Sequence, residues 1–308
     1  MKLTAARPNA PTVVVIGESL IDIVTGQSGK HSIHPGGSPL NVAVGLARLE
    51  VPTELATRIG DDPNGEVINS HLADAGVTLQ SGSRGAVRTS TSHASIGADG
   101  SATYDFDIGW DLREVHVEAP LAVHTGSLAT ILEPGASRID EALRRLPEKT
   151  LISFDPNIRP SLAPPRETTR ARVENFASLA HIVKMSEEDA AWLYPGTEPG
   201  ALAERFASLG VLLFVLTRAE RGCVIASNNT LRRLPAEPAT VVDTVGAGDA
   251  FMSGLIYEAI RSGAANQLTG KAVEAELIDA CAQTALRSAA ITVSRAGANP
   301  PNRRDLAR

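Results

Sequence analysis

Short apolar runs recur along the chain and indicate its architecture. Their residues are continuously hydrophobic rather than alternating with polar ones, as expected for strands that are buried on both faces of a sheet. Five such runs are predicted to be strands: residues 13–17, 121–126, 151–155, 181–185 and 211–217.

Segments with helical spacing lie between these runs. The clearest covers residues 38–51, where Ser38 is a suitable N-cap, Pro39 suits the first turn, and apolar residues follow at helical spacing. Residues 134–146 and 273–293 have the same period. Strands that alternate with helices predict an α/β fold, with a mainly parallel sheet covered by helices on both faces.

Two stretches depart from this alternation, residues 19–35 and 89–108. The first resembles extended chain with a turn, and the second resembles two alternating strands around the turn GADG. Alternation implies one solvated face, so we expect a small antiparallel sheet, a lid, beside the main domain. Tyr104 and Phe106 share one face of it. They could cover a ligand or pack a homodimer interface, and the pattern leaves both open.

Composition and charge narrow the function classes. The 308 residues are 43% hydrophobic and no linker interrupts them, so we expect a single domain over residues 1–308. The formal net charge of −6 argues against nucleic acid as a partner, because such a protein needs a basic surface. The apolar runs are too short for a bilayer, no signal peptide is visible, and Cys223 and Cys281 form no metal or disulfide motif. We therefore expect a cytoplasmic protein without membrane contact.

The candidate chemistry lies in VVDTVGAGDAFMSG, residues 241–254. The chain has no GxxxxGK[ST] P-loop and no protein-kinase signature, and Phe251 stands where a dinucleotide fingerprint needs its third glycine. Gly246 and Gly248 lack a Cβ, so a ligand can approach the backbone. The amides of residues 246–249 open a helix without partners inside it, and together with the helix dipole they predict an anion site.

Asp249 follows directly, in the first turn of that helix. Phosphorylation of an alcohol needs a base beside a phosphate site, because the hydroxyl loses its proton as it attacks while donors hold the phosphoryl oxygens. The stretch therefore predicts phosphoryl transfer to a hydroxyl.

DTVGAGDAF also resembles the C-terminal signature of the ribokinase (PfkB) family of carbohydrate kinases, and other segments match the family in order. PGGSPLNVAVGLARL at 35–49 resembles its N-terminal glycine-rich signature. DPNIRPSL at 155–162 and KMSEEDAAWL at 184–193 resemble its fructokinase-like branch, and VLTRAERG at 215–222 resembles the strand and turn under the nucleotide. The resemblance implies a ribokinase-like three-layer fold with a small antiparallel β lid, and an ATP-dependent carbohydrate kinase.

The resemblance also implies roles in catalysis. Asp249 is the implied general base. Asp243 and the carbonyl of Val245 are implied to hold a monovalent cation, with a turn or capping role as the alternative for Asp243. The implied anion hole consists of Gly246, Ala247 and Gly248.

The sugar-binding residues are implied in the same way. Asp22 is hard to explain as core, because a buried carboxylate needs partners, and a solvent-facing lid position is its alternative. Asn41 could instead be a polar residue of the helix surface, and Arg159 a surface arginine. The implied set is Asp22, Gly36, Gly37, Asn41, Phe106 and Arg159.

For the nucleotide and Mg²⁺, SEED at 186–189 stands where the family has Asn-x-x-Glu, which organises magnesium through water. Asp189 is the implied residue, and capping of a helix by Ser186 is an equal alternative. The implied nucleotide-binding set is Lys184, Ser186, Thr217, Gly222, Gly248 and Ser288.

These expectations combine into one hypothesis: ATP-dependent phosphorylation of D-fructose to fructose 6-phosphate, with Mg²⁺ and K⁺ as cofactors. Ribose, 2-keto-3-deoxygluconate and a nucleoside are alternative acceptors. A sugar-binding regulator that keeps the fold is the alternative outside the enzymes, and the presence of Asp249 argues against it.

Overall fold

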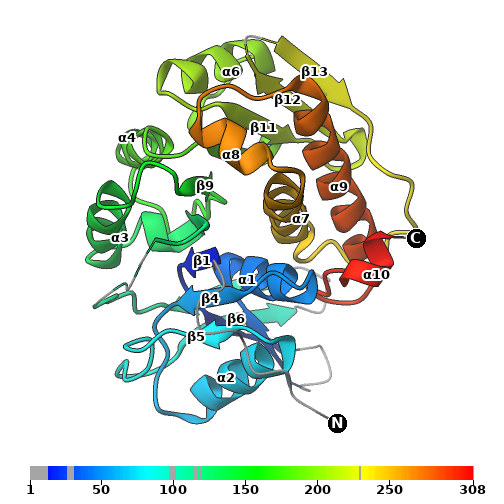
Figure 1. The fold of residues 1–308 in the computed structure, drawn as a ribbon. Coiled ribbons are helices and arrows are strands. Elements are labelled where there is room, and N and C mark those ends of the chain that lie inside the picture. Colours follow the sequence, from blue (N-terminus) through cyan, green and yellow to red (C-terminus); the bar gives the residue numbers. More distant parts are fainter. Residues whose placement is uncertain are drawn as a thin grey trace.

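The structure, a computed structural model, describes residues 13–25, 31–96, 102–113, 115, 117, 119–228 and 230–307. Its main sheet is built from β1 (Val13–Ile16), β4 (Thr53–Ala56), β5 (Thr78–Leu79), β8 (Ala122–Gly126), β9 (Leu151–Asp155), β10 (Ile182–Ser186), β11 (Leu213–Thr217), β12 (Cys223–Ser227) and β13 (Thr230–Leu234). Their order is β13-β12-β11-β10-β9-β8-β1-β4-β5 (Figure 1). The strands from β11 to β5 run parallel, and β12 and β13 form an antiparallel edge.

All five apolar runs form parallel strands of this sheet, with bounds that differ from the prediction by at most two residues. Successive side chains of a strand point to opposite faces, and both faces are covered here. In β1, Val13 and Val15 belong to one buried cluster, whereas Val14 and Ile16 belong to another. Burial on both faces explains why these strands have no polar alternation.

Helices form a layer on each face of the sheet. One buried cluster joins the sheet to α1 (Ser38–Arg48), α2 (Pro63–Ala75), α7 (Ala247–Ser262), α8 (Ala264–Thr269) and α9 (Ala275–Val293). The other joins it to α3 (Gly135–Arg144), α4 (Arg166–Ala177), α5 (Glu187–Leu193) and α6 (Pro199–Ser208). The short elements are η1 (Ser127–Thr130), η2 (Ala219–Arg221) and α10 (Arg303–Leu306). The three-layer α/β prediction is confirmed.

The start of α1 differs from the prediction. Its N-cap is Gly37, not Ser38, and Ser38 is the first helical residue. Gly37 has φ 107°, and a Cβ there would lie 2.6 Å from the Glu18 carbonyl oxygen, so only glycine fits. The Ser38 hydroxyl is thereby free for a contact with a distant part of the chain.

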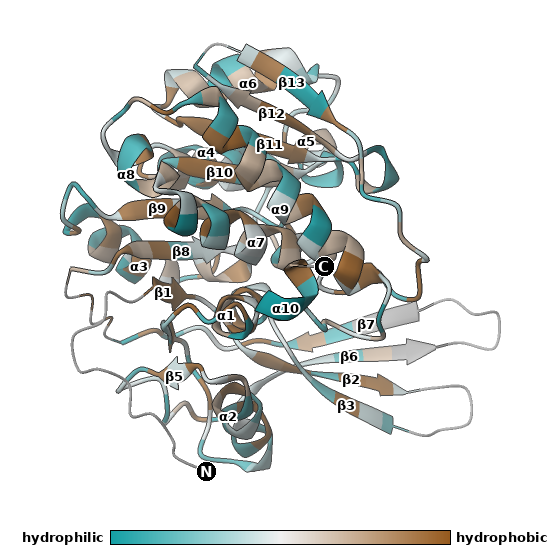
Figure 2. Ribbon diagram, turned by 45° about the vertical axis from the view of Figure 1, so that its right-hand side comes forward, coloured by the Kyte–Doolittle hydropathy of each residue, from teal (hydrophilic) through white to brown (hydrophobic). Residues whose placement is uncertain are grey.

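A second sheet lies beside the main domain and extends away from it (Figure 2). It consists of β2 (Leu20–Thr25), β3 (His31–Gly36), β6 (Ser90–Ile96) and β7 (Ala102–Asp107), in the order β3-β2-β6-β7. The β3–β2 and β6–β7 pairs are antiparallel, and β2 and β6 run parallel between them. The expected small sheet is therefore present, with its strands inside the predicted segments 19–35 and 89–108 except that β3 ends one residue later, at Gly36. The side chain of Tyr104 lies outside the described residues.

One row across the small sheet contains two residues that the sequence assigned to the sugar. Asp22 pairs with His34 on one side and with Ser92 on the other, and Ser92 pairs with Phe106. Directly paired residues point to the same face of a sheet. Asp22 and Phe106 therefore share a face.

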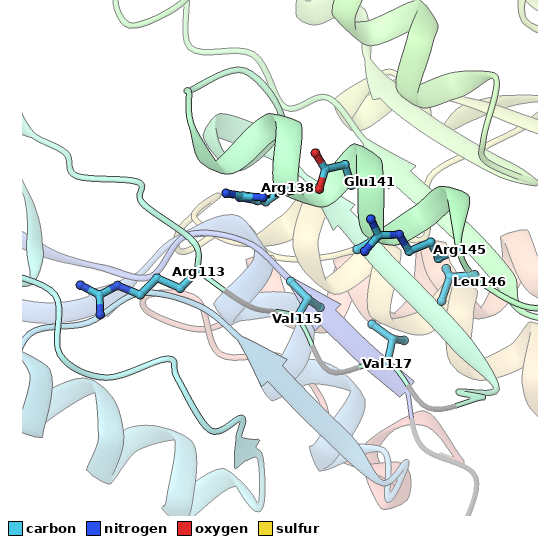
Figure 3. A pocket seen from close by; sticks show the side chains of 8 residues that line it. Arg113, Val115, Val117, Arg138, Glu141, Arg145 and Leu146 are labelled. Atoms are coloured by element: carbon cyan, nitrogen blue, oxygen red, sulfur yellow. Dashed lines mark ion pairs between the residues drawn. The ribbon is translucent and has the colours of Figure 1, made fainter.

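A hollow of about 630 Å³ lies at the surface of α3 (Figure 3). It is lined by Arg113, Val115, Val117, Arg138, Glu141, Ala142, Arg145 and Leu146. None of these residues was expected in the phosphate or sugar site. Within the described ranges, no helix is both long and apolar enough to cross a membrane.

Candidate active site

The N-terminus of α7 is open. Gly246 is the N-cap with φ 76°, and no side chain caps the helix. A Cβ on Gly246 would lie 2.7 Å from the Ala298 Cβ, which adds to the need for glycine here. In such a turn the amides of Gly248 and Asp249 have no carbonyl four residues earlier in the helix to bond. This geometry is suited to an anion.

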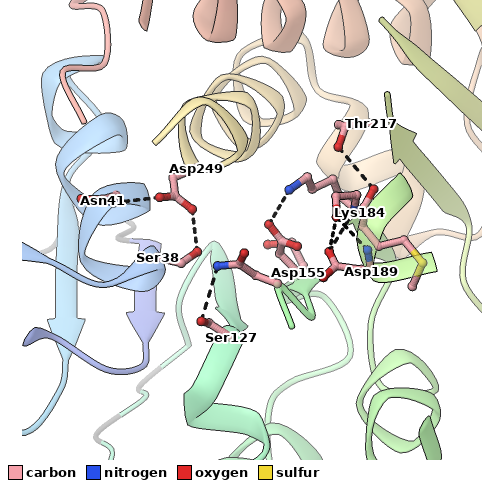
Figure 4. A network of polar contacts seen from close by, with 12 residues as sticks. Ser38, Asn41, Ser127, Asp155, Lys184, Asp189, Thr217 and Asp249 are labelled. Carbon is pink, nitrogen blue, oxygen red and sulfur yellow. Dashed lines mark hydrogen bonds and ion pairs between the residues drawn. The ribbon is translucent and has the colours of Figure 1, made fainter. Parts of the chain in front are cut away.

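The carboxylate of Asp249 is held by two residues of α1 (Figure 4). The Ser38 hydroxyl donates to Asp249 Oδ1 at 2.6 Å, and Asn41 Nδ2 donates to Oδ2 at 2.8 Å. Both donors come from the first turns of α1, which packs against α7. Two hydrogen bonds fix the carboxylate at the mouth of the helix, where a base for an incoming hydroxyl is required. Sequence reasoning missed the contact of Ser38 and assigned Asn41 to the sugar alone.

A buried ion pair lies beside this helix mouth. Lys184 Nζ donates to Asp155 Oδ2 at 2.8 Å, and the two residues are 4% and 1% exposed. Asp155 is the last residue of β9, and Lys184 is the middle residue of the neighbouring parallel strand β10. Burial raises the pKa of Asp155 to about 6 although Lys184 opposes the rise. Burial alone would lower the pKa of Lys184, but Asp155 raises it above its usual value, so the ammonium persists at neutral pH.

The segment 186–189 forms a capping box. Ser186 is the N-cap of α5, its hydroxyl accepts from the Asp189 amide, and the Asp189 carboxylate accepts from the Ser186 amide and hydroxyl. Asp189 Oδ1 also accepts from the Ile158 amide at 2.7 Å. Of the two alternatives for this segment, the structure thus shows the capping role. Among the described residues, no three acidic, histidine or cysteine side chains are grouped to hold a metal ion.

The loop before α7 is fastened by Asp243. Its carboxylate accepts from the Val245 amide at 3.0 Å and from the Gly297 amide at 2.8 Å. These bonds, with that to Val245 as the largest cause, lower the pKa of Asp243. The turn role of Asp243 is therefore present, and the charged carboxylate beside Val245 is compatible with a monovalent cation.

On the small sheet, Asp22 packs closely against Gly36 at the end of β3. A Cβ on Gly36 would lie 2.2 Å from Asp22 Oδ2, so any other residue there would displace the Asp22 carboxylate. Burial raises the pKa of Asp22, while a hydrogen bond with Ser92 and the charges of His34 and Arg159 lower it. Arg159 is exposed and donates to Asn157 Oδ1 at 2.8 Å. Its charge acts on Asp22, so these two sugar-site candidates lie near each other.

Glu18 is a buried acid that sequence reasoning missed. It follows β1, is 3% exposed, and its Oε2 accepts from the Ala129 amide at 3.0 Å. Burial raises the pKa of Glu18 from 4.5 to about 7, although bonds with Ser127 and Ala129 and the charge of Arg159 lower it. The signal in the sequence was an acid directly after a continuous apolar strand.

The remaining nucleotide candidates lie in two different places in the structure. Thr217 ends β11 and is partly exposed, and Gly222, with φ 77°, closes the turn that follows η2. Ser288 instead lies between α9 and α7. A Cβ added to Gly254 of α7 would lie 2.9 Å from the Ser288 Cβ. The Ser288 side chain is 0% exposed and offers no surface to a nucleotide in this structure.

A mainly parallel sheet with helices on both faces, a small sheet beside it and an acid at an open helix N-terminus are the features of a ribokinase-like kinase. A family model described as "pfkB family carbohydrate kinase" matches residues 10–305. The chain belongs to this family of carbohydrate kinases.

Within the family, the chain is similar to fructokinases. It is 31% identical over 277 residues to a fructokinase of Klebsiella pneumoniae, covering 87% of this chain and 90% of that one. The crystal structure of a Vibrio cholerae O395 fructokinase double mutant with fructose, ADP and potassium ion has a TM-score of 0.81 at 24% identity, covering 98% and 99% of the two chains. A Xylella fastidiosa fructokinase with bound ATP gives 0.81 at 24% identity, covering 96% and 97%. At this identity the two structures establish the fold.

Proposed function

We propose that the protein transfers the γ-phosphoryl group of ATP to a hydroxyl of D-fructose, giving fructose 6-phosphate and ADP. The observation that carries the proposal is the Asp249 carboxylate, fixed by Ser38 and Asn41 at the uncapped N-terminus of a 16-residue helix. Asp249 accepts the proton of the attacking hydroxyl, and the backbone of Gly246, Ala247 and Gly248 holds the phosphoryl oxygens.

The sugar would lie between the small sheet and the start of α1. Asp22 and Phe106 share one face of that sheet, and Gly36 and Gly37 allow close approach to the backbone. Asn41 uses its amide nitrogen on Asp249, which leaves its oxygen to accept from a sugar hydroxyl. A lid of residues 19–35 and 89–108 would close over the bound sugar. The same face could pack a second copy, since a homodimer through the lid remains the alternative.

ATP would extend from the α7 N-terminus toward the turn formed by Thr217 and Gly222. Magnesium fits best as part of the nucleotide, because Mg²⁺ is usually held by phosphates and water with few protein ligands. Asp189, whose two oxygens accept three bonds within the chain, would act on it only through water. Potassium fits the Asp243 carboxylate and the Val245 carbonyl, and would add positive charge near the anion hole.

Fructose as the acceptor is supported by the Klebsiella fructokinase and by the fructose in the Vibrio fructokinase structure. The test is the initial rate of ADP release with fructose, ribose, 2-keto-3-deoxygluconate and adenosine, compared as kcat/KM. We expect fructose to exceed ribose at least tenfold, or about 1.4 kcal/mol in transition-state binding. A higher kcat/KM for another acceptor would refute fructose as the substrate but would leave the kinase activity established.

A sugar-binding regulator is tested in the same assay. It would bind a sugar without releasing ADP, whereas the kinase releases ADP only when the sugar is present.

A cytoplasmic location is supported by the two buried free thiols, Cys223 and Cys281, and by the use of ATP, which the cytoplasm supplies.

A further inference from the structure

A chain of hydrogen bonds connects the exposed guanidinium of Arg159 to the buried carboxylate of Glu18. We propose that Asn157 is a positioning residue that holds the Arg159 guanidinium in place for the sugar. Ser127 and Glu18 anchor Asn157 in the interior. The inference rests on the proposed kinase function, and it assigns a role to three residues that the sequence did not indicate.

The hydrogen bonds of this chain all run in one direction. Arg159 Nη1 donates to Asn157 Oδ1 at 2.8 Å, and Asn157 Nδ2 donates to Ser127 Oγ at 3.4 Å. The Ser127 hydroxyl bonds the Glu18 carboxylate, whose Oε2 also accepts from the Ala129 amide. Arginine can only donate and an ionised carboxylate can only accept, so the amide and the hydroxyl between them have one consistent orientation. Hydrogen bonds in series polarise one another, which strengthens the whole chain.

The residues of the chain lie just beyond the ends of three neighbouring strands. β1, β8 and β9 are adjacent and parallel. Glu18 comes two residues after β1, Ser127 comes directly after β8, and Asn157 comes two residues after β9. A Cβ on Gly37 would lie 2.6 Å from the Glu18 carbonyl oxygen, so the anchor also contacts a glycine of the proposed sugar site. Ligands of α/β proteins bind at the carboxyl ends of parallel strands, which is where this chain lies.

The backbone at the two middle links is in an unfavourable conformation. Ser127 has φ 55° and Asn157 has φ 38°, in the left-handed region that residues with a Cβ seldom adopt. Such conformations persist where surrounding contacts compensate for their cost, and they are concentrated at functional sites. The Ile158 amide donates to Asp189 Oδ1 at 2.7 Å, which fastens the backbone directly after Asn157. In these conformations the two side chains meet in a hydrogen bond, as a positioning role requires.

One edge of the Arg159 guanidinium is available to a ligand. Its hydrogen bonds within the described part of the chain all use Nη1, which donates to Asn157 Oδ1 and to the carbonyl oxygens of Asn157 and Ile158. Nε and Nη2 therefore remain as a pair of donors, an arrangement suited to two adjacent oxygen atoms. Arg159 also acts electrostatically on Asp22, so this edge lies near an acceptor for sugar hydroxyls.

The benefit of holding Arg159 is a smaller loss of freedom when the sugar binds. An unrestrained exposed arginine has many rotamers, and a ligand must fix one of them at a cost in entropy. Asn157 fixes the guanidinium before the sugar arrives, so part of this cost is already met in folding. We therefore expect Asn157 to lower the KM for the sugar and to leave kcat almost unaffected.

The test is Asn157→Gly, because glycine adopts φ 38° without strain and removes only the side chain. We expect the KM for fructose to rise at least fivefold, with kcat and the KM for ATP within threefold of the wild type. Calorimetric affinity for fructose should fall by the same factor as the KM rises. A smaller rise in the KM overturns the proposal.

The matched control is Asn228→Gly. Asn228 also has positive φ, 50°, and its Nδ2 also donates within the chain, to the Val273 carbonyl, but it lies between β12 and β13. This variant removes the same side chain from the same kind of backbone and should leave every kinetic value unchanged. Circular dichroism and urea unfolding establish that both variants fold.

A double-mutant cycle separates positioning of Arg159 from a general loss of structure. Arg159→Ala alone should raise the KM for fructose at least tenfold. In the Arg159→Ala background, Asn157→Gly should change the KM less than twofold, because the group that it positions is absent. Effects that multiply in the double variant overturn the proposal, since Asn157 would then act independently of Arg159.

Ser127→Gly tests the anchor, and its φ of 55° also suits glycine. We expect the KM for fructose to rise about threefold in the wild type and to stay constant in the Asn157→Gly background. An unchanged KM in the wild type overturns the anchoring by Ser127 and Glu18. A wild type that binds fructose but phosphorylates none of the sugars overturns the proposed function instead. The calorimetric affinities then still decide for or against Asn157.

Discussion

Glu18→Gln is the substitution whose effect on stability follows most directly from the structure. Glu18 is 3% exposed, and its Oε2 accepts from the Ala129 amide. Glutamine has the same shape, keeps a carbonyl oxygen for that amide and carries no charge at any pH. The variant therefore removes the cost of ionising a buried acid and leaves the packing in place.

The magnitude comes from the pKa of Glu18, which burial raises from 4.5 to about 7. The folded protein binds this proton more tightly than the unfolded chain does, so ionisation opposes folding. At about 1.4 kcal/mol per pH unit, the full cost is about 3 kcal/mol above pH 7. This cost is absent below pH 4.5, where Glu18 is protonated in both the folded and the unfolded state. It grows as the pH rises from 4.5 to about 7.

The assay is the free energy of unfolding in urea at pH 5 and pH 8. The wild type should lose about 2–3 kcal/mol more stability than Glu18→Gln between these two values. Comparison with the variant cancels the other groups that titrate in this range, Asp155 and Asp22 among them. Glu148→Gln, at an exposed position, is the control and should follow the wild type. Parallel curves for Glu18→Gln and the wild type would refute the reasoning.

Three further predictions concern catalysis. Asp249→Asn should lower kcat on the order of 10²–10⁴-fold with little change in the KM for ATP, and a variant above about a tenth of wild-type kcat contradicts the base assignment. The rate should be higher in potassium than in a bulky organic cation at equal ionic strength, since Asp243 fastens the anion-hole loop; equal rates remove the cation site. Amide exchange in β7 should slow when sugar binds, with β9 as the unaffected control, and unchanged exchange in β7 indicates a structural sheet.

Much of the fold could be predicted because the local hydrophobic pattern of each segment agrees with the element that the segment forms. Continuous apolar runs located the parallel strands to within two residues, and helical spacing predicted residues 273–293 where α9 covers Ala275–Val293. Ser38 shows where local reasoning fails. It has the chemistry of an N-cap, but Gly37 caps α1 and the hydroxyl bonds Asp249, which is 211 residues away. No local pattern records such a partner.

In the candidate site, too, features set by the local backbone could be predicted from the sequence, whereas features set by tertiary packing could not. Residues whose role depends on local backbone could be named from their motifs, and Gly246 at the start of α7 and Gly222 in its turn both have positive φ. The burial of Ser288 could not be predicted, because it depends on how α9 packs against α7. Asp189 had two possible roles, and only the position of Ile158 and Ser186 around it favoured the capping role.

Glu18, Asp155 and Lys184 are charged residues that end, follow or interrupt continuous apolar runs of the sequence. Glu18 follows β1 after a glycine, Asp155 is the last residue of β9, and Lys184 lies inside the apolar run of β10. The carboxyl ends of parallel strands meet at one edge of a sheet, and ligands of α/β proteins bind there. A charged residue at the end of a continuously apolar strand is costly to bury, so its retention there is best explained by the site at that edge. The three charges thus have a common explanation: each lies on or just after a strand that the hydrophobic core fixes, so the core also fixes the geometry of the site.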